Sequence, residues 1–131
     1  MFTLAGGAIS WASRRQSVVA MSTTEAEYIA ASDATKEAIW LRRLLKDVGL
    51  RQEGPTILNV DNQGAIKLMR NPELHKLTKH INVRYHFIRE KVNGGEIEID
   101  YVKSEEQLAD IFTKALPKQT LLKLCCDLQI K

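Results

Sequence analysis

Apolar residues recur every three or four positions in several stretches of the chain, a spacing that places them on one face of a helix. The longest such stretch ends at Gly49, a residue type that commonly follows a helix. Another ends at Gly94-Gly95, and another begins at Ser104 and Gln107, which form a capping-box pattern. The helices predicted in this way run from Thr23 to Val48, from Ala65 to Asn71, from Lys79 to Asn93 and from Ser104 to about Leu116.

Other stretches have the pattern of strands. TILNVD is a short apolar run after Gly54-Pro55, and EIEIDYV alternates polar and apolar residues strictly. The predicted strands run from Phe2 to Ala12, from Arg14 to Met21, from Thr56 to Asp61 and from Glu96 to Val102, the first two forming a hairpin. This order of elements predicts a mixed sheet flanked by helices, in a single α/β domain over residues 1–131.

Composition narrows the class of protein without naming a function. The 131 residues are 44% hydrophobic and 27% charged, as in an ordinary folded domain, and the net charge of +3 permits a nucleic-acid partner without requiring one. The adjacent Cys125 and Cys126 are the only cysteines, which excludes a disulfide framework and favours a reducing compartment. No apolar run approaches the roughly 20 residues that cross a bilayer. We therefore expect a cytoplasmic or nuclear chain without a membrane partner.

Two glutamates in the stretch STTEAEY fall on nearly opposite sides of the first predicted helix. Glu25 forms a capping box with Ser22, and an acid near a helix N-terminus suits the helix dipole. Glu27 falls in an apolar stripe, where an ionised carboxylate is costly unless a cation, a metal or hydrogen bonds compensate it. The alternative for Glu27 is a second capping box with Thr24. The stripe of Glu27 holds Ala34, Leu41 and Leu45, whereas Glu25 shares its side with Ser32, Lys36 and Arg43.

Two aspartates are further candidate acids. Asp61 ends a predicted strand, and the carboxyl ends of strands are where sites collect in α/β sheets, but an Asp before a helix is also a common N-cap. Asp110 lies opposite the apolar residues of its predicted helix, so periodicity alone makes it a solvated surface acid.

Basic residues gather between Arg70 and Lys91. Lys76, Lys79 and His80 together could meet a phosphate backbone, and Arg84 and Arg89 follow them. The alternative is a solvated basic helix face. The histidines of this stretch lack the spacing of a helical zinc pair, which argues against a zinc site.

Three long strings identify a resemblance to a known family. These are ISWASRRQSVVAMSTTEAEYIAA, VDNQGAIKLMRNPELHKLTKHINVRYHFIRE and EQLADIFTKALP. Together they resemble the RNase H-like region at the carboxyl end of copia-type retrotransposon Pol polyproteins, over nearly the whole chain. The resemblance implies an RNase H fold that cleaves the RNA strand of RNA–DNA hybrids during reverse transcription, with the reverse transcriptase region of the same polyprotein as a partner and a virus-like particle as one location.

The resemblance also implies a set of site residues. The metal-binding and catalytic acids of the family match Glu27, Asp61 and Asp110, and Mg²⁺ (or Mn²⁺) is the implied cofactor, because hard divalent cations prefer carboxylate oxygens. Polar residues after the second acid contact the minor groove, where the 2′-hydroxyl distinguishes RNA from DNA. The expected nucleic-acid contacts are Thr24, Asn62, Gln63, Lys76, Lys79 and Arg84.

The chain departs from the family pattern in two places. The family carries another aspartate on a first, central strand, whereas this sequence begins at Met1 inside the second strand, so we expect a sheet that lacks its central strand. No histidine lies between Tyr101 and Asp110, where some RNase H enzymes carry one. The alternative to an active ribonuclease is thus an inactive remnant that at most binds nucleic acid or a protein partner. A plain structural domain without a nucleic-acid partner is a third reading.

Overall fold

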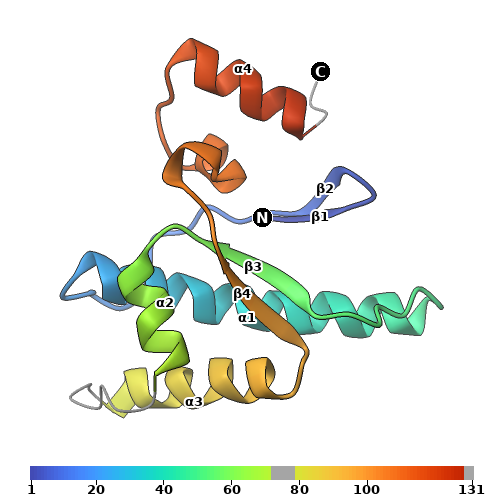
Figure 1. Ribbon diagram of the computed structural model, residues 1–131, viewed down its shortest axis with the longest axis vertical. Helices are drawn as coiled ribbons and strands as arrows, with labels where there is room; N and C mark the ends of the chain where they lie inside the picture. Colours follow the sequence, from blue (N-terminus) through green and yellow to red (C-terminus); the bar gives the residue numbers. More distant parts are fainter. Residues whose placement is uncertain (72–78, 129–131) are drawn as a thin grey trace. The chain divides into compact units, whose positions relative to one another are not determined.

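The computed structural model describes residues 1–71 and 79–128, and the chain divides into two compact units. The central unit is Val18–Tyr101, and the terminal unit combines Met1–Ser17 with Val102–Lys131. Each unit is treated by itself below. Figure 1 labels the elements, and both strands and helices are present, as expected for an α/β protein.

A two-stranded parallel sheet forms the middle of the central unit. Strands β3 (Thr56–Val60) and β4 (Ile97–Tyr101) pair in register, with Thr56 opposite Ile97. Side chains alternate between the faces of a strand, and here one face is buried and the other exposed. The buried face consists of Leu58, Val60, Ile97 and Ile99.

Three helices pack around this sheet: α1 (Thr23–Asp47), α2 (Gln63–Arg70) and α3 (Lys79–Asn93), as Figure 1 shows. All three lie close to their predicted positions, and β3 and β4 confirm the last two predicted strands. Arg42 on α1 fixes the connection that leads into β3. Its guanidinium donates to the carbonyls of Gln52 and Gly54 at 3.1 and 2.7 Å and to Thr56 Oγ1 at 3.1 Å.

The start of the chain differs from the prediction. Strands β1 (Phe2–Leu4) and β2 (Gly7–Ser10) form an antiparallel hairpin within the stretch predicted as one strand. Ala5 and Gly6 both have positive φ, the conformation that tight hairpin turns require. The strand predicted from Arg14 to Met21 is wrong, because this segment forms no strand.

The reason lies in burial, since β-branched residues favour strands only where they pack against a neighbour. Val19 is 90% exposed. The described strands therefore form two separate ladders, β1–β2 and β3–β4, and not the one mixed sheet that we expected.

The end of the chain also differs. The helix predicted from Ser104 to Leu116 is replaced by two short 3₁₀ helices, Ser104–Glu106 and Leu108–Phe112. Lys103, and not Ser104, is the N-cap of the first of these helices, and the Lys103 side chain makes no capping bond. Helix α4 (Lys118–Asp127), which the sequence pattern missed, follows Pro117.

No helix in the described ranges is long and apolar enough to cross a membrane.

Candidate functional site

The N-terminus of α1 settles the role of Glu25. Ser22 is the N-cap, and its Oγ accepts from the Glu25 backbone N–H at 3.1 Å. The Glu25 carboxylate in turn accepts from the Met21 N–H at 2.8 Å. The predicted capping pair is therefore confirmed, with the carboxylate reaching one residue further back than in a standard capping box.

Glu27 does not form a second capping box. Helix α1 begins at Thr23, so Thr24 already lies inside it and cannot be the N-cap of Glu27. The side chain of Glu27 is half-buried. The most buried stripe of α1 runs along Tyr28, Ser32, Thr35 and Ile39.

This stripe differs from the predicted one, because Ser32 was expected on the polar side with Glu25. At about 100° per residue, Glu25 and Glu27 lie on opposite flanks of the observed stripe. Helical phase thus separates the two glutamates, as predicted, but it places both at the border of the core.

Asn62, and not Asp61, caps the helix that follows β3. The Asn62 Oδ1 accepts from the Ala65 N–H at 2.9 Å. Asp61 lies between the end of β3 and this cap, and its side chain is half-buried. The capping alternative for Asp61 is therefore wrong, and the side chain lies at the carboxyl end of a parallel strand, where ligands bind in α/β sheets.

The starts of α1 and α2 meet at Gly64. A Cβ atom at this position would lie 3.0 Å from Thr24 Oγ1 and 3.1 Å from Asn62 Oδ1, closer than side-chain carbons normally approach. A larger residue here would have to push the Thr24 and Asn62 side chains back by a few tenths of an ångström, and glycine avoids this. This contact brings together the helical turn of Thr24 and Glu27 and the segment from Asp61 to Gln63, so five of the predicted site residues belong to converging segments.

Asp110 lies in the terminal unit, within the second 3₁₀ helix. Its side chain is only 13% exposed, and an oxygen of the carboxylate binds Lys114 Nζ at 2.7 Å. The description of Asp110 as a solvated surface acid is therefore wrong. Its predicted role as a metal ligand stays a prediction.

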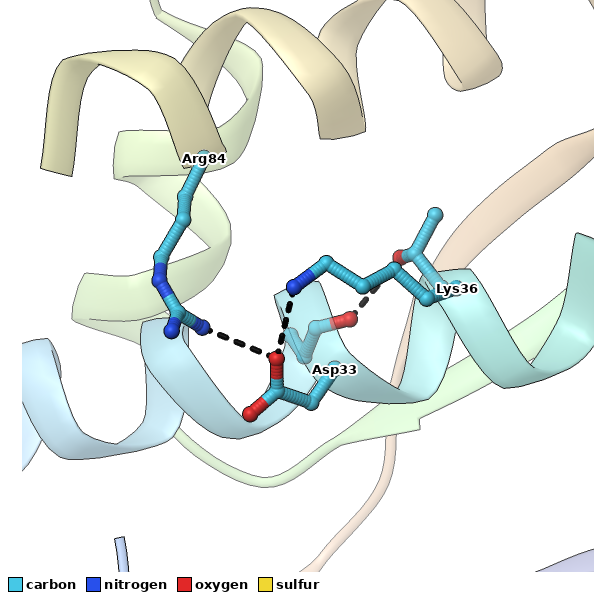
Figure 2. A network of polar contacts seen from close by, with 5 residues as sticks. Asp33, Lys36 and Arg84 are labelled. Atoms are coloured by element: carbon cyan, nitrogen blue, oxygen red, sulfur yellow. Dashed lines mark hydrogen bonds and ion pairs between the residues drawn. The ribbon is translucent and has the colours of Figure 1, made fainter. Parts of the chain in front are cut away.

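The predicted basic contacts have different outcomes. Lys76 lies outside the described residues, and the side chain of Lys79, the first residue of α3, is not described. Arg84 is placed: its Nη1 donates to Asp33 Oδ1 on α1 at 2.9 Å, an oxygen that also accepts from Lys36 Nζ at 3.0 Å (Figure 2).

This ion pair ties α1 to α3 and has an electrostatic signature. Burial raises the pKa of Asp33, but the hydrogen bonds and the positive charges of Lys36 and Arg84 together outweigh it. The net pKa of the Asp33 carboxyl therefore lies below its ordinary value. One edge of Arg84 thus serves the packing of two helices, and a contact with phosphate would use its other donors.

The donor chemistry of the central unit fits a hard divalent cation. Mg²⁺ is held by one or two protein carboxylates and keeps several waters, and Glu27 and Asp61 are two carboxylates on converging segments. Within residues 1–71 and 79–128, no three or more His, Cys, Asp or Glu side chains form a group that could hold a metal ion.

Some residues of interest were not singled out from the sequence. Lys67 and Tyr101 line a groove with Gln63 beside α2. The spacing of Gln63, Lys67 and Arg70 along α2, which places them on one face, was the available signal.

The chain is similar over most of its length to parts of long transposon polyproteins. It is 47% identical over 128 residues to the retrovirus-related Pol polyprotein from transposon TNT 1-94 of Nicotiana tabacum. This match covers 98% of this chain and 10% of that protein. It is 41% identical over 110 residues to the retrovirus-related Pol polyprotein from transposon RE1 of Arabidopsis thaliana, covering 84% of this chain and 8% of that protein.

A more distant similarity extends to yeast. The chain is 28% identical over 123 residues to the transposon Ty1-NL2 Gag-Pol polyprotein of Saccharomyces cerevisiae, covering 92% of this chain and 7% of that protein. No family model and no solved structure matches the chain. The homologues are copia-type retrotransposon Pol polyproteins, and the chain spans about a tenth or less of the length of these relatives.

Proposed function

We propose that this chain is the RNase H-like part of a retrotransposon Pol polyprotein and hydrolyses the RNA strand of RNA–DNA hybrids with Mg²⁺ or Mn²⁺. The observation that carries the proposal is the close approach at Gly64, which joins the turn of Thr24 and Glu27 to the end of β3. The similarity to Pol polyproteins supports an origin in such a protein.

Each acid has a role in this proposal. Glu27 and Asp61 hold the cation from two converging segments, and Asp110 is the third proposed ligand. A bound divalent cation would supply the hydroxide and stabilise the leaving oxygen of the phosphodiester. Because Asn62 Oδ1 is engaged as the helix cap, the exposed Gln63 is the better placed of the two amides to contact the minor groove of the hybrid.

The setting follows from the polyprotein. We propose that the reverse transcriptase region of the same polyprotein is the partner that delivers the hybrid. The similarity of the chain to a Pol polyprotein supports this choice. We place the activity in the cytoplasmic virus-like particle or in the nucleus.

A hybrid-cleavage assay with Mg²⁺ tests the proposal. We expect Glu27→Gln or Asp61→Asn to lower the rate by roughly a hundredfold or more, the order of loss seen when one preorganised electrostatic group is removed from an active site. The matched control is Glu25→Gln, two residues earlier on the same helix, which keeps an acceptor for the Met21 N–H and leaves the rate unchanged.

Two outcomes would contradict the proposal. One is an equal loss in Glu25→Gln and Glu27→Gln, which would show that the N-terminus of α1 acts only through stability. The other is an absence of cleavage while hybrid binding persists, which favours the non-catalytic remnant.

A further inference from the structure

A groove of about 430 Å³ lies beside α2 at the carboxyl end of β4. It is within the central unit and contains neither Glu27 nor Asp61. Residues Gln63, Lys67 and Arg70 share one face of α2, since they are spaced by four and three positions. The six lining residues are Gln63, Ile66, Lys67, Arg70, Asn71 and Tyr101.

Tyr101 gives the groove an aromatic surface. It is the last residue of β4 and is 46% exposed, so part of its ring faces solvent. Ile66, on α2, adds an apolar wall and is itself buried. An exposed ring beside an apolar wall is suited to a flat ligand with an apolar face, and every nucleobase has one.

The rim of the groove is basic. Lys67 is exposed, and Arg70 is held in place because its Nη2 donates to the Ile99 carbonyl at 2.7 Å. A guanidinium has five donors, so this bond leaves others for an anion. None of the six lining residues is acidic. The groove therefore combines an aromatic surface with two cations, the combination that binds single-stranded nucleic acid.

An amide side chain completes the match. Asn71 carries a donor and an acceptor in one side chain, as the edges of nucleobases do. A base inside a duplex has both faces covered by its neighbours and cannot stack on a protein ring without being unstacked. The chemistry of the groove therefore selects an unpaired base.

We propose that this groove binds one unpaired nucleobase of a single-stranded nucleic acid, stacked on Tyr101, with the flanking phosphates against Lys67 and Arg70. The inference rests on the proposed function for the class of ligand. It adds a subsite for a single-stranded segment next to the hybrid. An aromatic side chain of a protein partner could fill the same groove, and the experiment below separates the two.

The test is a titration of the complete 131-residue chain with fluorescein-labelled oligothymidylate in EDTA, followed by anisotropy. Tyr101→Ala should weaken binding by about tenfold, the loss expected for one base stack, whereas Tyr101→Phe should stay within about twofold. Lys67→Ala should reduce the slope of log K against log salt concentration by about 0.7, the contribution of one phosphate contact on a single strand.

The matched control is Lys46→Ala, an exposed lysine in the last turn of α1 that does not line this groove. It should leave the affinity and the salt slope unchanged. If Tyr101→Ala fails to fold by circular dichroism, Lys67→Glu at an exposed helix position carries the test, with a loss larger than that of Lys67→Ala.

Three results would overturn the inference: unchanged binding in Tyr101→Ala, an equal loss in Lys46→Ala and Lys67→Ala, or equally tight binding of a blunt DNA duplex. The first of these results would favour an aromatic side chain of a protein partner as the occupant of the groove. Because EDTA prevents metal-dependent cleavage, this measurement is separate from the hybrid assay. If the chain does not cleave the hybrid but Tyr101→Ala weakens oligothymidylate binding, only the proposed function is rejected. If the chain cleaves the hybrid but Tyr101→Ala leaves binding unchanged, only the proposed groove is rejected.

Discussion

The two units of the chain are stabilised in different ways. The central unit holds nearly all the buried apolar side chains, among them Tyr28, Ile88 and Ile97, each at most 1% exposed. In the terminal unit, only Leu124 and Leu128 are buried apolar residues among those described. The terminal unit also contains the β1–β2 hairpin and two 3₁₀ helices. The rings of Trp11 and Phe112 stack there, with their centroids 5.8 Å apart.

The difference shows where stability resides. Burial of apolar surface is the main favourable term in folding, so a unit with few buried side chains opens at lower cost. Glu27 and Asp61 are in the well-packed unit, whereas Asp110 is in the other. Glu27 and Asp61 therefore have the firmer support, and Asp110 lies in the unit that opens at lower cost.

Truncating a buried side chain in the core of each unit should give the largest effects on stability. Ile97→Ala removes a fully buried side chain of β4 and should lower the free energy of unfolding of the central unit by about 3 kcal/mol, measured by denaturant titration. Leu124→Ala, its counterpart on α4, should raise hydrogen exchange in α4 while the amides of α1 and β3 keep their protection. Equal loss of protection in both units after Leu124→Ala would show that they unfold as one.

Breaking the ring stack should have a smaller effect, confined to the terminal unit. Trp11→Ala removes the contact with Phe112 and should cost about 1 kcal/mol, because stacked rings contribute that much beyond their area. Hydrogen exchange of the β1–β2 hairpin measures it. Trp40→Ala is the control, since Trp40 is exposed on α1 and has no ring stack among the described residues. A comparable change in the hairpin for Trp40→Ala would refute the assignment.

Lowering the pH should have the smallest effect on stability, and this effect should act on the central unit. The folded pKa of Asp33 is lowered, so its ion pairs stabilise the fold above the ordinary carboxyl pKa, and this contribution disappears as the pH falls through the lowered value. Asp33 is 57% exposed, so solvent screening limits the effect to less than about 1 kcal/mol. The Asp33→Asn variant should be less stable than the original sequence at neutral pH and equally stable in acid. Thermal unfolding at both pH values measures this difference.

The size of this difference should also depend on ionic strength. About 1 M salt shortens the screening length to roughly 3 Å, so the gap between Asp33→Asn and the unchanged chain at neutral pH should shrink. A gap that persists at high salt and in acid would mean that Asp33 contributes through packing and not through charge.

The sequence predicted best those helices in which apolar residues recur at helical spacing over many positions and a glycine follows the last of them. The helix predicted from Thr23 to Val48 is observed as Thr23–Asp47, and the one from Lys79 to Asn93 matches α3. The errors fall where local preference has no tertiary support, as in the strand predicted from Arg14 to Met21. Ser104 and Gln107 have the sequence pattern of a capping box, but a 3₁₀ helix, and not an α-helix, begins at Ser104.

The candidate site was predictable to a different extent at each residue. Ser22 and Glu25 are neighbours on one helix, so their pairing could be inferred from spacing and is confirmed. Asp61 and Asn62 are both good N-caps, and only the structure shows that Asn62 takes this role. The contact of Gly64 with Thr24 joins residues far apart in sequence, and no local pattern encodes it. The metal-binding roles of Glu27, Asp61 and Asp110 stay predictions.

The parallel pairing of β3 with β4 has a consequence for synthesis. In the β1–β2 hairpin, Phe2 faces Ser10, so the ladder can close as soon as a short loop has formed. Thr56 instead pairs with Ile97, and the intervening segment must cross over before the two strands meet. A ribosome delivers the chain from its N-terminus, so Leu58 and Val60 emerge long before β4 does. Until Tyr101 has left the exit tunnel, this nascent strand lacks the partner that it pairs with in the finished fold, and it is then most exposed to aggregation or to chaperones.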